Sequence, residues 1–290
     1  MSSTVTDFPK AISSTNKISA ATKVHSWAMS DIAYDQIELE KVKSDEVLFF
    51  VLASASLIES GSDMYTSVLV DYFGDSDVAN WLTGQWEHEE LQHGESLRKY
   101  VESVWPEFDW AATYQSFFDE YSGYCTVNQF EPTPTLELVA RCVVETGTAA
   151  LYRALEDYTD EPILKLLAGN IRRDEVRHYK NFNRFFNQYN REAGHGRWPI
   201  FKALARRLAE LRNEDSDCAL RHIFEHRYPG VGTDTDQFKR ISRAARSLVL
   251  KNITPDMMVK MFLQPLQLPG YVRNTVEKPC SQMMRFFMAS

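Results

Sequence analysis

The sequence has few cysteines, no long apolar run and almost no alternating β pattern. Its cysteines, Cys125, Cys142, Cys218 and Cys280, stand far apart and form no CxxC pair. This spacing argues against a disulfide framework or a zinc ribbon, and it favours a reducing, cytoplasmic compartment. No stretch approaches about eighteen consecutive apolar residues, so no transmembrane helix is expected.

The N-terminal segment has the composition of a mobile tail. Residues 1–24 are rich in Ser, Thr and Lys and contain a single acid. No apolar core follows the first methionine, so a secretion signal is not expected. An organellar targeting peptide remains an alternative, although the segment lacks the arginines that are typical of one.

The charge is unevenly distributed along the chain. The net charge is −8, with 16 basic against 31 acidic residues in 1–196 but 12 against 7 in 197–251. An acidic protein of this kind is a poor candidate for binding nucleic acid. The basic region 197–251 is expected to form a solvated helix face, and the alternative is a surface for an acidic partner protein.

Glycine and proline are sparse over 45–104 and 135–190, where apolar residues recur at steps of three and four. This period predicts helices. We expect four long helices: about Asp45–Tyr72, from near Asp75–Asp77 to before Pro106, one that follows Pro132–Pro134, and Pro162 to about Asn190. Shorter helices are expected over 110–121, 199–213, 216–227, 235–250 and 254–263. The predicted fold class is all-α, with a bundle at 25–196 and a helical extension at 197–290 packed on it.

Two short motifs carry potential metal ligands on the second and fourth long helices. They are Glu90-x-x-His93 and Glu175-x-x-His178. Residues three apart project from one face of a helix, so each pair presents a carboxylate and an imidazole together. Each pair alone is weak evidence, and its context decides its meaning.

Two further glutamates lie in the middle of apolar helical stretches. They are Glu59 in VLASASLIESGS and Glu145 in LVARCVVETGTAALY. A charge in such a position is costly unless it is paired or metal-bound. A buried salt bridge would also explain either residue alone. The spacing favours metal, because Glu59 precedes Glu90 by 31 residues and Glu145 precedes Glu175 by 30.

The chain therefore contains one helix-hairpin unit twice, with Glu on the first helix and Glu-x-x-His on the second. This is the ligand arrangement of ferritin-like di-iron carboxylate bundles. Four carboxylates and two imidazoles suit iron or manganese better than a closed zinc site. The four negative charges would also balance two ferrous ions. We expect two iron ions in a ferritin-like four-helix bundle, and a mixed manganese–iron pair remains an alternative.

Four neighbouring residues are candidates for supporting roles: Glu89, Asp174 and Arg177 around the ligands, and Thr148 as a catalytic group. Glu89 and Asp174 each precede a paired glutamate and could orient the opposite histidine through its free ring N–H, although each could equally be a solvated acid. Thr148 lies three residues after Glu145, on the same face. Its hydroxyl is a candidate catalytic group, and the alternative is a threonine that bonds back to its own helix.

Two other motifs resemble metal sites but are interpreted differently. Glu192-x-x-His195 lies at the glycine-bounded end of the fourth helix, and we interpret it as accidental. His222-x-x-Glu225-His226 fits the inverted zinc-protease pattern. It falls in a short basic helix with no further ligand evident downstream, so an exposed polar helix is the preferred interpretation.

The segments GQWEHEELQHGESLRKY and LAGNIRRDEVRHYKNF resemble the two Glu-x-x-His helices of the soluble acyl-carrier-protein desaturases. The matching residues are Glu89, Glu90, His93 and Gly94 in the first, Asp174, Glu175, Arg177 and His178 in the second, and Glu145 and Thr148 in ETGTAA. Gln92 replaces the arginine expected in the first motif. The resemblance covers about residues 45–190, and the chain is shorter than typical members of the family.

The resemblance implies that Glu90 and Glu175 bridge the two metals and that Thr148 serves oxygen activation. It also implies a homodimer that takes electrons from a ferredoxin and removes two hydrogens from an acyl chain borne on a carrier protein or coenzyme A. The chain has no G-x-G-x-x-G loop, so a separate electron donor is expected.

Two other functions stay open at this point. One is a di-iron N-oxygenase or related tailoring monooxygenase acting on a small amine or acid. Enzymes of that type use an additional histidine, and His88 lies off the metal face of its helix. The other is a non-enzymatic iron-binding or ferroxidase protein, against which the long C-terminal region counts.

Overall fold

The computed structural model describes residues 26–210 and 215–289. The tail predicted at 1–24 lies outside these residues, and so does the end of the helix predicted over 199–213. Over the described ranges the regular structure is entirely helical, without a β-strand. The all-α prediction is therefore confirmed.

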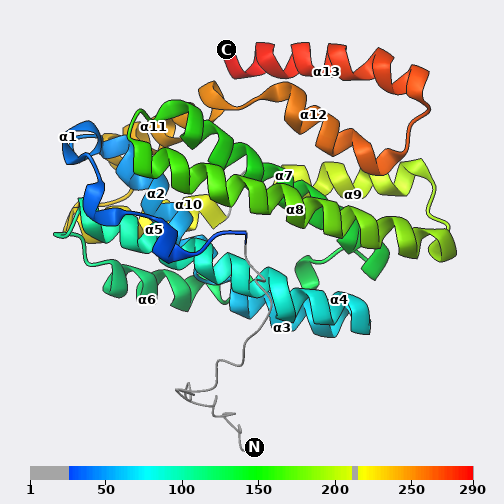
Figure 1. Cartoon of the computed structure of the whole chain (residues 1–290), viewed down its shortest axis with the longest axis horizontal. Helices are drawn as coiled ribbons and strands as arrows, with labels where there is room; N and C mark the ends of the chain where they lie inside the picture. Colours follow the sequence, from blue (N-terminus) through cyan, green and yellow to red (C-terminus); the bar gives the residue numbers. More distant parts are fainter. Residues whose placement is uncertain (1–25, 211–214, 290) are drawn as a thin grey trace, which may run out of the picture.

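Two pairs of long helices form the centre of the molecule (Figure 1). α2 (Glu46–Glu59) packs on α5 (Glu87–Val104), and α7 (Pro134–Tyr158) packs along the length of α8 (Pro162–Ala193). α5 also contacts α8, which joins the two pairs. Each pair corresponds to one copy of the repeated unit in the sequence.

The ends of these helices follow from their local sequence. The side chains of Asp45, Thr133 and Glu161 each accept a hydrogen bond from the first turn of the helix that follows. Proline occupies the first turn of α7 and α8, where its missing N–H costs nothing. α8 ends on Gly194, whose φ of 66° suits glycine because it has no Cβ.

The first predicted helix, 45–72, is broken in the structure. α2 ends at Glu59, and α3 (Ser62–Phe73) continues at an angle of 42°. The break falls at a Ser–Gly pair, Ser60 and Gly61, which is a common cause of sharp kinks. The Ser62 hydroxyl donates to the backbone carbonyl of Glu59 at 2.7 Å, across the break.

The second predicted helix is continuous but not uniformly α-helical. α4 (Ser76–Trp81) passes through a π-helical segment, Leu82–Trp86, into α5. A π-helical turn contains one residue more than an α-helical turn, so it rotates the residues that follow. Here the residues that follow include Glu89 and Glu90.

The remaining helices surround this centre. They are α1 (Leu39–Val42), α6 (Trp110–Tyr121), α9 (Arg197–Glu210), α10 (Asp215–Arg227), α11 (Asp236–Asn252), α12 (Pro255–Leu263) and α13 (Gly270–Ala289). α9, α11 and α12 pack on α7, and α10 and α11 pack on α2. α13 packs on α12 at the outside of the molecule (Figure 1). No separate helix was predicted in this part of the expected extension, and Pro279 stands inside the helix.

The apolar residues of the long helices lie inside the protein. In α2 every residue from Leu48 to Leu57 is buried. Large side chains such as Phe49, Phe50 and Phe182 are almost completely shielded from solvent. In the described ranges no single helix is long and apolar enough to cross a membrane, and the bent pair α2–α3 reaches that threshold only when both helices are counted together.

Candidate metal centre

The structure brings all six predicted ligands together in two overlapping groups. Glu59, Glu90, His93 and Glu175 form one group, and Glu90, Glu145, Glu175 and His178 form the other. Within each group one potential ligand atom per residue lies within 4.8 Å of all the others, and every residue is buried. The two groups share Glu90 and Glu175. These residues therefore form one cluster that could hold metal.

The first group is centred on the imidazole of His93. Its Nδ1 lies 3.1 Å from Glu175 Oε1, 3.7 Å from Glu90 Oε2 and 3.9 Å from Glu59 Oε2. The three carboxylates come from α8, α5 and the last residue of α2. The bend after Glu59 thus falls directly beside the cluster.

The second group repeats this arrangement around His178. Its Nδ1 lies 3.0 Å from Glu90 Oε1, 3.5 Å from Glu145 Oε2 and 3.9 Å from Glu175 Oε2. Glu90 directs one oxygen toward each histidine. Glu175 does the same, with Oε1 toward His93 and Oε2 toward His178.

The unsatisfied atoms of the cluster fit a metal. His93 Nδ1, His178 Nδ1 and Glu175 Oε1 are buried and have no hydrogen-bond partner among the described residues. Buried polar atoms are rarely left unpaired. Two ligands at right angles, each about 2.1 Å from one ion, are about 3.0 Å apart, which is close to the shortest separations here. The lone pairs converge as metal ligands do, at distances that suit an ion.

The outer nitrogen of each histidine is held by a carboxylate from the opposite pair of helices. His178 Nε2 lies 2.8 Å from Glu89 Oε2, and His93 Nε2 lies 3.1 Å from Asp174 Oδ2. Arg177 donates to both acids, at 2.8 Å to Glu89 and 2.7 Å to Asp174. A histidine that donates from Nε2 keeps a lone pair on Nδ1, so this frame presents both Nδ1 atoms to the cluster.

Trp27 extends this frame toward the N-terminal segment. Its indole N–H donates to Asp174 Oδ2 at 2.8 Å, and its ring lies parallel to that of His93 with centroids 6.3 Å apart. Gln92 donates to the backbone carbonyl of Trp27 at 3.3 Å. The residue that departs from the desaturase motif thus helps to hold this tryptophan against the cluster.

Two hydroxyl groups of α7 donate to carboxylates of the cluster. Thr148 Oγ1 donates to Glu175 Oε2 at 2.7 Å, and it also lies 3.2 Å from the carbonyl of Glu145 in its own helix. Tyr152 donates to Glu59 Oε1 at 2.5 Å. Tyr152 was not predicted as a site residue. Its position seven residues after Glu145, two turns along the same face, is the signal that could have identified it.

The four acids of the cluster are perturbed in opposite directions, because the adjacent histidines lower the pKa of Glu90 and of Glu175 despite their burial. Burial and the neighbouring carboxylates raise the pKa of Glu59 well above its usual range, and burial raises the pKa of Glu145 in the same way. Burial alone would lower the pKa of His93 and of His178, but the neighbouring carboxylates, including those that accept from Nε2, raise both well above the ordinary value. Before metal binds, the cluster therefore retains protons near neutral pH.

Metal binding is expected to release these protons, because a metal takes the deprotonated carboxylate and the neutral imidazole. The apparent affinity should therefore rise as pH increases. Calorimetric titration with ferrous ion in two buffers of different ionisation enthalpy measures the number of protons released. An identical observed heat in both buffers would contradict the protonation state inferred for Glu59 and Glu145.

Gly94 allows α5 to approach the bend beside the cluster. A Cβ on Gly94 would lie 2.5 Å from Ser60 Oγ, 2.7 Å from Ser60 N and 2.9 Å from Ser60 Cα. Gly94→Ala should therefore destabilise the protein by about 1–3 kcal/mol and weaken metal binding, because His93 moves away from Glu59. Thermal unfolding and metal titration test this. Gly84→Ala is the control, since no atom lies within 4 Å of its added Cβ.

The other two candidate motifs lie outside the cluster. Glu192 is exposed, and His195 lies beyond the end of α8, where its Nε2 is 3.3 Å from the Thr133 hydroxyl. His222 corrects a prediction, because it is only 8% exposed and its helix is not simply an exposed polar one. Its Nε2 lies 3.1 Å from Glu120 Oε2.

A polar network explains the burial of His222. The Ser116 hydroxyl lies 3.1 Å from both His222 and His226. Arg221 binds both oxygens of Glu120, at 2.6 and 2.9 Å, and holds the pKa of that carboxyl down at about 2. Cys218 also lies within ligand distance of Glu120 and His222. Since Arg221 already neutralises Glu120, this network is suited to joining α6 to α10 rather than to binding a cation.

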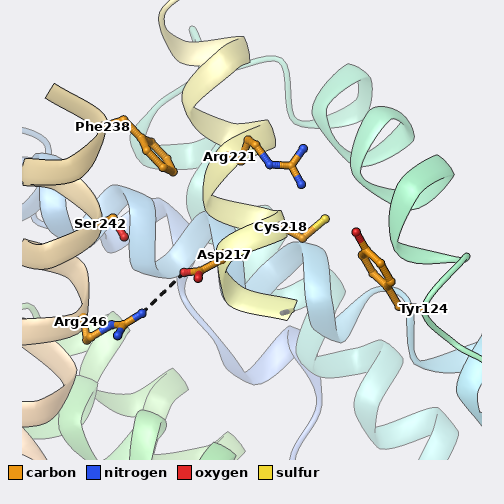
Figure 2. Close-up of a pocket in the computed structure, with 7 residues that line it drawn as sticks. All are labelled: Tyr124, Asp217, Cys218, Arg221, Phe238, Ser242 and Arg246. Carbon is orange, nitrogen blue, oxygen red and sulfur yellow. Dashed lines mark ion pairs between the residues drawn. The ribbon is translucent and has the colours of Figure 1, made fainter. Parts of the chain in front are cut away.

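The pocket beside this network is separate from the metal centre. It has a volume of about 380 Å³. Figure 2 shows that residues of α10 and α11, together with Tyr124, line it. Its lining includes Arg221 and Arg246 but none of the six cluster residues.

A scan against protein-family models finds no match for the chain, and a search of curated proteins finds none either.

Proposed function

We propose that the six residues bind two iron ions and that the chain is an oxygen-activating di-iron oxidase on a ferritin-like four-helix bundle. The observation that carries this proposal is the overlap of two ligand groups that share Glu90 and Glu175. A pair of metals bridged by two carboxylates uses ligands in this way. On this proposal Glu59 and His93 complete one position, and Glu145 and His178 complete the other.

The donor set supports iron. Four carboxylates and two imidazoles are hard and borderline ligands, with no thiolate among them. Four carboxylate charges compensate two divalent ions, so the loaded site is close to neutral in its buried surroundings. Iron, or manganese with iron, is therefore the expected content.

When bound, a pair of ferrous ions supplies the reducing equivalents for dioxygen activation and hence for oxidation of an unactivated C–H bond. The protein has to position ligands, exclude water and hold protons. The Trp86 ring packs beside His178, and Phe182 packs against Trp86, so that side of the cluster is apolar. The Thr148 hydroxyl holds a proton at Glu175 Oε2. Trp27 is buried and joined to His93 through Asp174, so on this proposal it lies on the electron route from an external donor such as a ferredoxin.

We propose an acyl chain on a carrier protein or on coenzyme A as the substrate, in a homodimer like that of the desaturases. The resemblance of both Glu-x-x-His helices to the acyl-carrier-protein desaturases supports this substrate class. A surface feature agrees with it. α11 exposes Lys239, Arg240, Arg243 and Arg246, and the acids that face two of them, Glu46 and Asp217, lie at 3.6 and 3.8 Å. Such weakly paired bases are suited to an acidic partner.

The test is a turnover experiment with the reconstituted protein, a reductant and oxygen. Acyl chains on carrier protein, the same chains on coenzyme A, and a panel of small amines and acids are compared by product mass. Loss of two hydrogens from an acyl chain supports the proposal. Insertion of an oxygen atom into an acyl chain or an amine would show that the protein is a monooxygenase and not a desaturase. Iron oxidation without any product indicates a ferroxidase and contradicts the proposed oxidase.

A further inference from the structure

The two metal positions receive unequal support from α7. Tyr152 donates its phenol proton to Glu59 Oε1 at 2.5 Å, and the Tyr152 side chain is completely buried. Thr148 donates to Glu175 Oε2 at 2.7 Å. Glu175 belongs to both ligand groups, whereas Glu59 belongs only to the group around His93, so only the Tyr152 contact distinguishes the two positions.

The equivalent positions of the first hairpin provide no such contact. The first glutamates of the two units are 86 residues apart, so Ser62 and Thr66 correspond to Thr148 and Tyr152. Ser62 donates to the backbone carbonyl of Glu59 at 2.7 Å, and Thr66 donates to the carbonyl of Ser62 at 3.1 Å. Both bonds stay within the helical backbone, because the 42° bend directs α3 away from the line of α2.

The side chains of Glu59 and Glu145 consequently differ in conformational freedom. Tyr152 occupies Glu59 Oε1 and leaves Oε2 to face His93 Nδ1, at 3.9 Å. Glu145 faces His178 at 3.5 Å and receives no hydroxyl from the equivalent positions of the first hairpin. A ligand that is already fixed loses less freedom when a metal binds, so its position binds more tightly.

We propose that Tyr152 is a positioning residue that makes the metal position beside His93 the tighter of the two. This inference rests on the proposed two-metal centre. The position beside His178 then fills second, and its ion is the more readily exchanged.

Tyr152→Phe tests the inference, because it removes one oxygen and keeps the ring. Anaerobic calorimetric titration of the metal-free protein with ferrous ion should show two steps in the wild type. In the variant the tighter step should weaken by about 10–100-fold, with the weaker step unchanged, so that the two steps converge. A crystal loaded with one equivalent of Mn²⁺ should show anomalous density beside His93 in the wild type.

Tyr100→Phe is the matched control. Tyr100 is also completely buried and donates to a buried carboxylate, Glu161 Oε2, at 2.8 Å. Glu161 is not part of the metal cluster. The control should lose a comparable hydrogen bond and leave both metal steps unchanged. Circular dichroism melts of both variants establish that they are folded.

The outcomes separate this inference from the proposed function. If Tyr152→Phe leaves both steps unchanged, or weakens both equally, the positioning role is wrong and the two-metal centre stands. If the first Mn²⁺ ion lies beside His178 in the wild type, the positioning role is likewise wrong and the two-metal centre stands. This outcome does not require the variant. If the wild type binds no metal at all, both proposals fail.

Discussion

Glu175→Gln is expected to abolish tight metal binding at both positions at once. Glu175 belongs to both ligand groups, with Oε1 3.1 Å from His93 Nδ1 and Oε2 receiving the Thr148 hydroxyl. The amide removes a negative charge and one metal-binding oxygen while keeping the shape. The loss in affinity should exceed the 10–100-fold that is typical of removing an outer hydrogen-bond partner. Ferrous titration should change from two equivalents per chain to none at micromolar concentration.

Glu192→Gln is the matched control for this variant. It makes the same substitution on the same helix, also within a Glu-x-x-His motif, but Glu192 is exposed and lies outside the cluster. It should bind metal like the wild type. Equal loss in both variants, or retention of two equivalents by Glu175→Gln, would show that the cluster is not the metal centre.

Glu137→Gln is expected to produce the largest loss of stability. Glu137 is completely buried and accepts hydrogen bonds from Arg141 at 2.7 Å and from Arg207 at 3.0 Å. Both arginines are buried as well, so removal of the charge leaves them without full compensation. Breaking a buried ion pair in this way costs about 3–5 kcal/mol. The melting temperature should fall by roughly 6 °C or more.

Glu102→Gln provides the comparison for Glu137→Gln. Glu102 pairs with Arg98 at 3.0 Å on α5, with the two side chains 44% and 34% exposed. Solvent screens an exposed pair, so this change should alter stability by less than about 1 kcal/mol. Similar melting temperatures for the two variants would contradict the structural role assigned to the Glu137 network.

The long helices and the six cluster residues could be predicted because each leaves a periodic trace in the sequence. Apolar residues at steps of three and four indicate the helices. The near-equal spacings of 31 residues from Glu59 to Glu90 and 30 from Glu145 to Glu175 indicate the repeated ligands. The contacts of Glu89 and Asp174 with the opposite histidines also follow from this repeat, since each acid directly precedes a paired glutamate.

Other features could not be predicted, because they depend on contacts across the fold. In the sequence, Ser60 and Gly61 look like small residues that a long helix tolerates. Whether the helix bends there depends on its packing against the rest of the fold. Tyr152 looks like an ordinary core aromatic until Glu59 is placed opposite it. Trp27 is separated from Asp174 by 147 residues, so no local pattern connects them.

His222 shows the opposite error, since a polar helix was expected to be exposed. Burial of that histidine depends on α6, which supplies both Ser116 and Glu120. A single helix does not show which of its faces a neighbouring helix covers. The sequence pattern therefore identified the histidines but not their surroundings.

Iron stoichiometry tests directly whether the six buried residues bind two metal ions. The metal-free protein is loaded with ferrous ion without oxygen, freed of excess metal, analysed for iron, and then mixed with oxygen while its optical spectrum is followed. We expect about two iron ions per chain and an oxygen-dependent absorption change that Glu175→Gln lacks. Failure to bind iron, or two ions retained by Glu175→Gln, would contradict a di-iron centre at these six residues.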